Sequence, residues 1–165
     1  MSGALRVGQG FDTHRFGAGD HIMLGGVRIV HERGVVAHSD GDVLLHALTD
    51  ALLGAAGLGD LGHHFPDTDP RWAGAAGLDL LGNVMQKLTV AGWRVGNADC
   101  TLVAEAPRLA PHLPAMRANV AAALEVDETR VSLKATTAET MGFIGRGEGI
   151  AALAVVLLTG AVGDA

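Results

Sequence analysis

The sequence contains very little of several residue types, and each shortage excludes a class of protein. Its 165 residues include one cysteine, Cys100, and no tyrosine. A single cysteine excludes an intrachain disulfide framework, so we expect Cys100 to be a small buried apolar residue. Aromatic residues make up only 4% of the chain, and no basic stripe accompanies them. The sequence therefore gives no sign of a nucleic-acid-binding surface.

Charged residues are also scarce, at 18% of the chain, and acidic residues are in excess. Twelve Lys and Arg residues stand against 18 Asp and Glu residues, which gives a formal net charge of −6. An acidic chain that binds an anionic substrate must do so locally. Metal ions, backbone N–H groups and a few Arg or Lys side chains are the means available.

Hydrophobic runs long enough to cross a membrane are missing as well. The longest, Ile150 to Leu158, has nine residues, whereas a membrane-spanning helix needs about 20. The N-terminal residues lack the apolar stretch of a signal peptide. We therefore expect a soluble cytoplasmic protein without a membrane partner.

The sequence has an excess of apolar side chains. They make up 48% of the chain, and the mean hydropathy is +0.30. The length predicts one domain, residues 1–165 with a core at about 5–159. A monomer of this size could not bury so many apolar side chains. We therefore expect an obligate oligomer with large apolar interfaces.

Periodicity and turn residues divide the chain into strands and helices. We expect strands at 5–11, 22–24, 27–29, 93–104, 131–136 and 150–158, with a Gly25-Gly26 turn after the second. Helices are expected at 43–56, capped by Ser39 or Asp40, at 78–91, and in a segment that ends near Leu124. Residues 59–70 should be a loop, and 137–148 a turn with a short helix. The last strand is apolar on both faces, which is typical of a central strand in a sheet covered on both sides.

One combination of residues suggests a metal site. Asp12 and His14 are two apart in an extended segment, so their side chains project to the same side. A helical His46 facing them would complete an Asp/His/His set, the three-ligand pattern of catalytic zinc. Spacing alone slightly favours the alternative that these are unrelated polar residues, because Asp-x-His is a common tripeptide. Asp42 and Asp50, one helical turn either side of His46, could orient its ring, or could simply cap and solvate the helix.

Seven blocks of residues, in order along nearly the whole chain, resemble those of one family, the 2-C-methyl-D-erythritol 2,4-cyclodiphosphate synthases. The blocks are Asp12 to His14, Ala37 to Asp42 with His46 to Gly54, Gly59 to Gly62, Phe65 to Pro70, Ala106 to Arg108, Lys134 to Thr137, and Gly142 to Gly149. Each block alone is a weak signal, whereas the ordered set is specific.

The resemblance implies a fold and a reaction. The fold would be α+β, with a mixed sheet, helices on one face, and the sheets of three subunits packed together in a homotrimer. The reaction would convert 4-diphosphocytidyl-2-C-methyl-D-erythritol 2-phosphate into the cyclic diphosphate and CMP. The substrate's own 2-phosphate attacks the β-phosphorus, so the protein needs no nucleophile and must supply positioning and charge neutralisation.

The resemblance also assigns roles to residues. Zinc would be held by Asp12, His14 and His46, and a second divalent cation, Mg²⁺ or Mn²⁺, by Glu139, which without the resemblance would be an exposed glutamate. His38 and Thr137 would stabilise the transition state, Ser39 would contact phosphate or cap the helix, and Asp60 would hydrogen-bond the polyol hydroxyls. The pocket wall would comprise Leu61, Gly62, Phe65, Pro66, Asp67, Thr68 and Asp69, although Phe65 alone would suit a core role.

The remaining implied residues bind the nucleotide end of the substrate or line the threefold axis. Cytidine diphosphate would lie against Ala104, Arg108, Leu109, Ala110, Ala135, Thr136 and Thr137. Arg108 stands where many members have lysine, so its point-charge role is in question. Phe143 and Arg146, with Phe11, match a central cavity that holds an isoprenoid diphosphate in some relatives.

Two other functions share parts of this pattern. A zinc hydrolase of a nucleotide-linked diphosphate would use the same triad but would incorporate solvent oxygen. A trimeric scaffold with structural zinc would need a closed four-ligand site, often with cysteines, and the chain has one cysteine.

Overall fold

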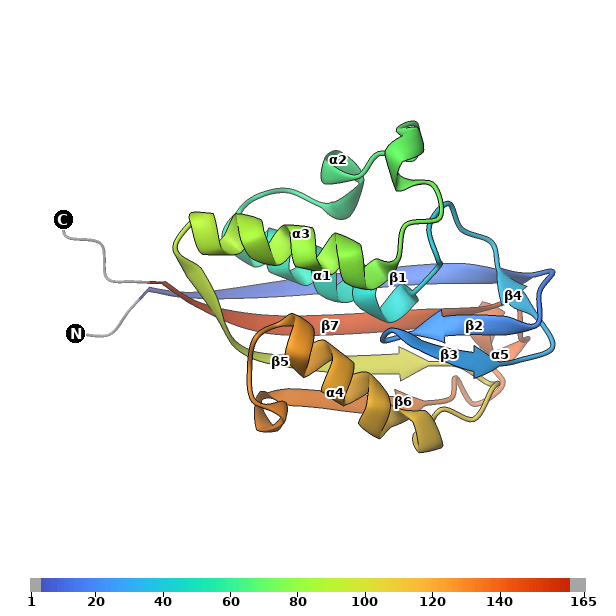
Figure 1. Cartoon of the computed structure of the whole chain (residues 1–165). Coiled ribbons are helices and arrows are strands. Elements are labelled where there is room, and N and C mark those ends of the chain that lie inside the picture. The colour runs from blue at the N-terminus through green and yellow to red at the C-terminus, as the bar shows by residue number, and fades with distance from the viewer. Residues whose placement is uncertain (1–3, 161–165) are drawn as a thin grey trace.

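Two long antiparallel strands form the centre of the structure, a computed structural model that describes residues 4–160 (Figure 1). The predicted domain's residues 1–3 and 161–165 lie outside the described part. Strand β1 (Leu5–Gly17) pairs with β7 (Gly149–Gly160) along almost its whole length. β7 pairs on its other side with β5 (Trp93–Val103), also antiparallel. The prediction that the last strand is central is therefore confirmed.

Two shorter strands complete a mixed sheet of order β4-β1-β7-β5-β6. β6 (Val131–Thr136) runs parallel to β5, and β4 (Gly34–Val35) pairs with the end of β1. A separate hairpin joins β2 (His21–Leu24) to β3 (Val27–Val30). Its turn residues, Gly25 and Gly26, both have positive φ, as the predicted two-residue turn requires.

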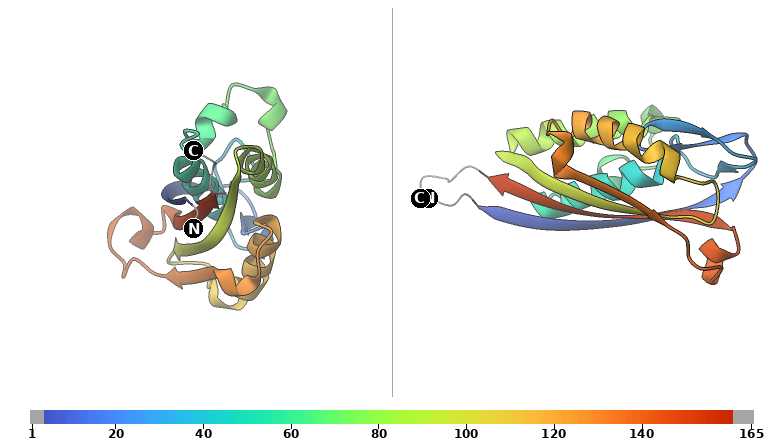
Figure 2. Two further views of the ribbon diagram at one scale, coloured as in Figure 1. Left: turned by 90° about the vertical axis from the view of Figure 1, so that its left-hand side faces the viewer. Right: turned by 90° about the horizontal axis from the view of Figure 1, so that it is seen from below.

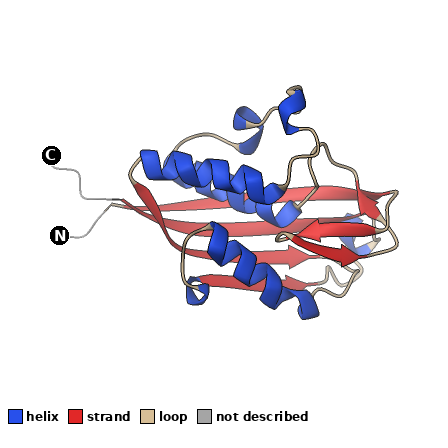
Figure 3. Cartoon of the chain, in the orientation of Figure 1, coloured by secondary structure: helices blue, strands red, loops and turns tan. Residues whose placement is uncertain are grey.

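Three long helices lie on the same side of the sheet (Figures 2 and 3). They are α1 (Val43–Ala56), α3 (Gly77–Val90) and α4 (Leu113–Ala123), which confirms the predicted α+β class with helices on one face. Short helical turns make up the rest: α2 (Leu61–His64), α5 (Gly142–Gly145) and the 3₁₀ turns Pro70–Trp72, Ala110–His112 and Glu128–Arg130. No helix in residues 4–160 is long and apolar enough to span a membrane.

Helix α1 lies unusually close to β1. Gly8 and Gly10 face it, and a Cβ atom on either glycine would overlap a backbone oxygen of the helix, that of Ala51 or Ala47. Almost every α1 side chain is buried, including the predicted apolar stripe Leu44, Leu48, Ala51 and Ala55. The core therefore lies between the sheet and these helices, and Cys100 is buried in it as predicted.

The opposite face of the sheet is bare in the single chain. Apolar side chains of β1 and β7 are exposed there, from 40% for Leu153 to 69% for Val7; the group comprises Leu5, Val7, Phe11, Leu153 and Val155. We call this group the open sheet face. Isolated exposed apolar residues are common on protein surfaces, but a contiguous set on adjacent strands marks an interaction surface.

Three local predictions were wrong. β1 continues to Gly17, so Asp12 and His14 lie within the strand rather than at its end. The N-cap of α1 is Asp42, because its carboxylate reaches the Leu45 N–H, whereas Ser39 and Asp40 lie too early in the chain. The expected loop at 59–70 contains helix α2, which forms because the Asp60 side chain accepts the His63 N–H and caps it.

Candidate active site

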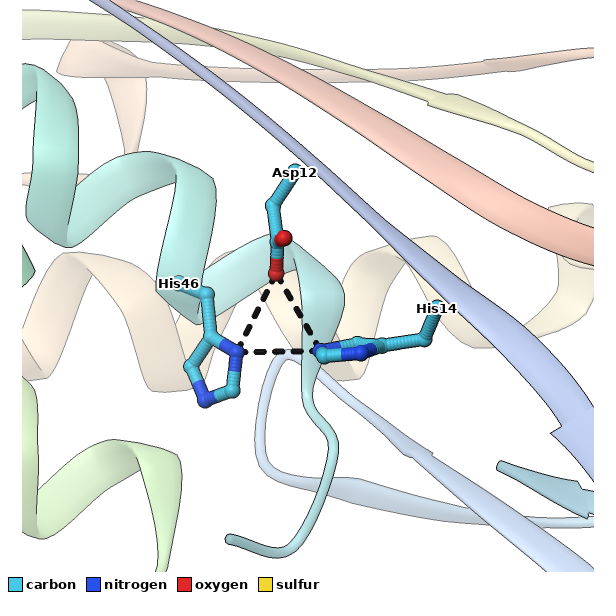
Figure 4. A group of neighbouring side chains, drawn as sticks. All are labelled: Asp12, His14 and His46. Atoms are coloured by element: carbon cyan, nitrogen blue, oxygen red, sulfur yellow. Dashed lines mark hydrogen bonds and ion pairs between the residues drawn. The ribbon is translucent and has the colours of Figure 1, made fainter. Parts of the chain in front are cut away.

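Asp12, His14 and His46 converge at the junction of β1 and α1 (Figure 4). His14 Nε2 lies 3.0 Å from His46 Nδ1, and each nitrogen lies 3.1 Å from Asp12 Oδ2. Asp12 and His14 continue the β1 face that carries Gly8 and Gly10. The close approach of α1 allowed by the two glycines therefore brings His46 within reach of the strand.

The triad has the dimensions of a metal site. Zinc bonds of roughly 2.0–2.2 Å put neighbouring tetrahedral ligand atoms about 3.3 Å apart. The three separations of 3.0–3.1 Å are slightly shorter, so small side-chain adjustments would admit an ion. One carboxylate and two imidazoles suit a divalent ion such as zinc, and three ligands leave a position for substrate.

Electrostatics at the triad favour a cation. Burial alone would raise the pKa of Asp12, but hydrogen bonds and charges of His14 and His46 hold that pKa well below its usual range. Burial alone would lower the pKa of His46, but its contact with Asp12 and nearby carboxylates raises it. The partly buried side chains of the triad thus stabilise positive charge between them, which a proton or a divalent metal can supply.

The residue that orients His46 is Ser39, which sequence reasoning assigned to phosphate or to capping. Ser39 Oγ lies 3.0 Å from His46 Nε2, the ring nitrogen that faces away from the triad. Asp42 instead accepts backbone N–H groups, and Asp50 accepts the Leu61 N–H. Of the two roles left open for these carboxylates, capping is confirmed for Asp42, whereas the ring nitrogen that either would orient is bonded to Ser39 instead.

An open cleft of about 610 Å³ lies beside the triad. It brings together most residues predicted for the metal and polyol end of the substrate: Asp12, His14, His38, Ser39, His46, Asp60, Leu61, Gly62, Phe65 and Asp67. Phe65 is buried against Trp72 and also lines the cleft, so both of its predicted roles are compatible. Asp50, Trp72 and Leu80 line the cleft too, and no local sequence signal singled out the last two.

A second hollow, of about 240 Å³, lies at the ends of β5 and β6. Its lining includes all seven residues predicted to hold the nucleotide: Ala104, Arg108, Leu109, Ala110, Ala135, Thr136 and Thr137. Each of the two hollows is lined by a different set of residues. One chain therefore presents the metal end and the nucleotide end of the predicted site as separate halves.

The loop after β6 is held by a residue that sequence reasoning missed. Glu105 Oε1 accepts N–H groups from Ala138 at 2.8 Å and Thr140 at 3.4 Å. Within the loop, the Thr137 hydroxyl donates to Glu139 Oε1 at 3.2 Å. Because Glu105 follows β5 and the loop follows β6, only the parallel pairing of these strands brings them together.

Some predicted residues lie outside both hollows. Pro66, Thr68 and Asp69 belong to the same segment as Phe65 and Asp67 but do not line the cleft, and Asp69 instead pairs with Arg71. Phe143 lies in α5 and is 44% exposed, and Arg146 pairs with Glu148. Glu139 is close to Thr137 without lining the nucleotide hollow.

Relatives of known identity resemble the chain over most of its length. A protein named 2-C-methyl-D-erythritol 2,4-cyclodiphosphate synthase from Alcanivorax borkumensis is 61% identical over 155 residues, 94% of this chain and 97% of the relative. One of the same name from Chromohalobacter salexigens is 63% identical over 154 residues, 93% of this chain and 95% of the relative.

Solved structures agree with these sequence relatives. The Plasmodium falciparum IspF–CDP complex matches with a TM-score of 0.84 and 30% identity, covering 97% of this chain and 99% of that one. The bifunctional IspDF of Campylobacter jejuni matches with a TM-score of 0.92 and 46% identity, covering 97% of this chain but 43% of that longer one. The model of the YgbB family matches residues 5–159. The chain therefore belongs to the YgbB family, that of the 2-C-methyl-D-erythritol 2,4-cyclodiphosphate synthases.

Proposed function

We propose that the chain converts 4-diphosphocytidyl-2-C-methyl-D-erythritol 2-phosphate into 2-C-methyl-D-erythritol 2,4-cyclodiphosphate and CMP. An oxygen of the 2-phosphate forms a bond to the β-phosphorus, and the bond from that phosphorus to the oxygen of the α-phosphate breaks. The electron pair leaves with CMP. The observation that carries the proposal is the convergence of Asp12, His14 and His46 at a cleft that His38 and Ser39 also line.

The residues of the cleft have separate tasks in this reaction. Asp12, His14 and His46 would hold zinc, which acts as a Lewis acid towards the diphosphate when bound. His38 and Ser39 lie at the same wall and would donate hydrogen bonds to the phosphoryl oxygens as charge develops. Asp60, whose Oδ1 accepts the His63 N–H at the start of α2, would accept hydroxyl groups of the polyol through its other oxygen.

The nucleotide end of the substrate would occupy the hollow beside Arg108. Backbone groups of 104–110 and 135–137 would contact the cytosine, and Arg108 the diphosphate. Thr137 would contact the transferred phosphoryl group. Glu139, at 3.2 Å from the Thr137 hydroxyl, would be the one protein ligand of a second divalent cation, Mg²⁺ or Mn²⁺. This sparse protein ligation suits a magnesium ion whose other ligands are phosphate and water.

The two halves would meet in a homotrimer. The open sheet face gives three copies an apolar surface to pack against one another, and burial of such a contiguous patch stabilises association. The metal half of one subunit would then face the nucleotide half of its neighbour. Phe143 and Arg146 would lie near the threefold axis, where an isoprenoid diphosphate would be the ligand. We place the enzyme in the cytoplasm.

Phosphorus NMR of the product distinguishes this reaction from hydrolysis. With zinc and magnesium, the diphosphocytidyl substrate should give CMP and a cyclic diphosphate without ¹⁸O from labelled water, and a chelator should stop turnover. A linear phosphate carrying ¹⁸O would refute the proposal. The relatives carry the name of a cyclodiphosphate synthase, so the hydrolase alternative has no support from them.

A further inference from the structure

The loop at residues 36–41 connects β4 to α1 without regular secondary structure. It carries His38 and Ser39, the two cleft residues proposed to contact phosphate, and we call them the phosphate wall. His38 and Ser39 both line the cleft from this loop. A loop that contributes transition-state contacts must be held still, since misplacement by about 1 Å can cost a hundredfold in rate. The contacts that hold the loop therefore bear on catalysis.

The loop is bonded to a segment almost 40 residues further along the chain. The His38 carbonyl accepts the Gly74 N–H at 2.9 Å, and the Asp40 N–H donates to the Ala75 carbonyl at 3.1 Å. The Asp40 carboxylate adds a third link, because its Oδ2 accepts the Gly77 N–H at 2.8 Å. Its other oxygen accepts the Asp42 N–H at 3.1 Å, so one side chain is held from both sides.

The partner of Asp40 is the start of helix α3. Gly77 is the first residue of this 14-residue helix, and the residue before it, Ala76, provides no side-chain cap. Unpaired N–H groups and the helix dipole both favour a carboxylate at this position. Asp40 thus supplies from a distant loop the cap that the local sequence of α3 lacks.

The same link joins the two walls of the cleft. On one side of it lies the phosphate wall with His38 and Ser39. On the other, the chain from Phe65 to Ala76 leads into α3 and contributes Phe65 and Trp72 to the lining of the cleft, and we call these two residues the polyol wall. Loosening the link would let the two walls shift relative to one another. All three proposed metal ligands would be retained on β1 and α1, although the contact between Ser39 and the His46 ring would loosen with the loop.

We propose that Asp40 is a positioning residue for the reaction: its carboxylate ties the His38–Ser39 loop to the N-terminus of α3 and so fixes the distance between the phosphate wall and the polyol wall. The inference rests on the proposed function through the roles of His38 and Ser39. Asp40 itself does not line the cleft, so its effect on the reaction is exerted through the residues it holds.

The test compares Asp40→Asn with Asp79→Asn in the full-length zinc-loaded enzyme. Asp79 is exposed in the first turn of α3, so its replacement removes the same charge from the same helix end without touching the loop. In Asp40→Asn, kcat should fall by about tenfold to about a hundredfold, as expected for the loss of a charge-assisted hydrogen bond. KM, oligomer mass and the zinc content at saturating zinc should stay close to wild type, because all three ligands are retained, and Asp79→Asn should match wild type throughout.

Amide hydrogen exchange provides a second readout that does not depend on turnover. The Gly77 N–H should exchange slowly in the wild type and in Asp79→Asn, and faster in Asp40→Asn. Wild-type kcat in Asp40→Asn, equal losses in both variants, or rapid Gly77 exchange in the wild type would each overturn the inference. Failure of the wild type to form a cyclic product would refute the proposed function, whereas the exchange comparison would still stand.

Discussion

Replacing Asp42 with alanine should destabilise the fold more than any other loss of a single helix cap in this chain. Asp42 is fully buried, and its carboxylate accepts three backbone N–H groups. Two come from the hairpin turn, Gly25 at 3.0 Å and Gly26 at 2.8 Å, and the third from Leu45 in the first turn of α1 at 3.1 Å. Alanine would leave all three donors without this partner and in positions that water reaches poorly.

The expected loss of stability follows from these contacts. A hydrogen bond to a charged acceptor contributes about 1.5–3 kcal/mol, so three such bonds set an upper range of about 4.5–9 kcal/mol. Burying a charged carboxylate costs free energy, and this cost offsets part of the stabilisation from the three bonds. The same burial raises the pKa of Asp42, although its three N–H donors act in the opposite direction. We expect a net loss of about 3–5 kcal/mol, the range typical of removing one partner of a buried charged interaction.

Urea unfolding at fixed protein concentration measures this loss, because association contributes to the stability of any oligomer. The matched control is Asp127→Ala. Asp127 caps the exposed 3₁₀ turn Glu128–Arg130 through the Thr129 N–H at 2.9 Å, so its loss should cost about 1 kcal/mol or less. A similarly small loss in Asp42→Ala would refute the reasoning, since the three buried hydrogen bonds would then contribute little to the free energy of unfolding.

Four further outcomes are expected. His46→Ala should abolish zinc binding, measured by elemental analysis, and cyclisation, while circular dichroism remains that of the wild type. Asp60→Ala should keep its zinc but lose most turnover; an equal loss of zinc would place Asp60 among the metal ligands. Leu153→Asp should dissociate the proposed trimer in sedimentation runs, because it puts a charge into the open sheet face; an oligomeric state unchanged from the wild type would argue against that interface. Arg108→Ala should raise KM by about tenfold, as for one lost charged contact, and an unchanged KM would remove Arg108 from the diphosphate site.

The main elements of the fold could be predicted from the sequence because their patterns are local. Alternation, helical spacing and the Gly25-Gly26 turn identified the long strands, helices α1 and α3, and the hairpin. Caps were predicted less well. Asp40, Asp42 and Ser39 are all good capping residues, and which one caps α1 depends on tertiary placement: Asp42 on the hairpin, Asp40 on the start of α3.

In the candidate site, too, local features could be predicted from the sequence, whereas features set by tertiary contacts could not. The alternation of side chains along an extended segment predicted that Asp12 and His14 point together. The predicted helix offered His46 as the third member, and the resemblance favoured the set over unrelated polar residues. Side-chain partners could not be predicted, because Ser39 reaches His46 through a loop, and Glu105 reaches Ala138 only after two strands pair in parallel. The separation of the two hollows likewise depends on the order of strands in the sheet.

Gly8 and Gly10 also bear on the coordination chemistry. They set the height of α1 above β1, and this height governs how far the His46 imidazole stands from Asp12 and His14. A single methyl group added at Gly10 would overlap the Ala47 carbonyl, beside His46, and so would lift the helix and open the triad. The affinity of the proposed metal site should therefore depend on the two glycines of β1 as well as on the ligands themselves.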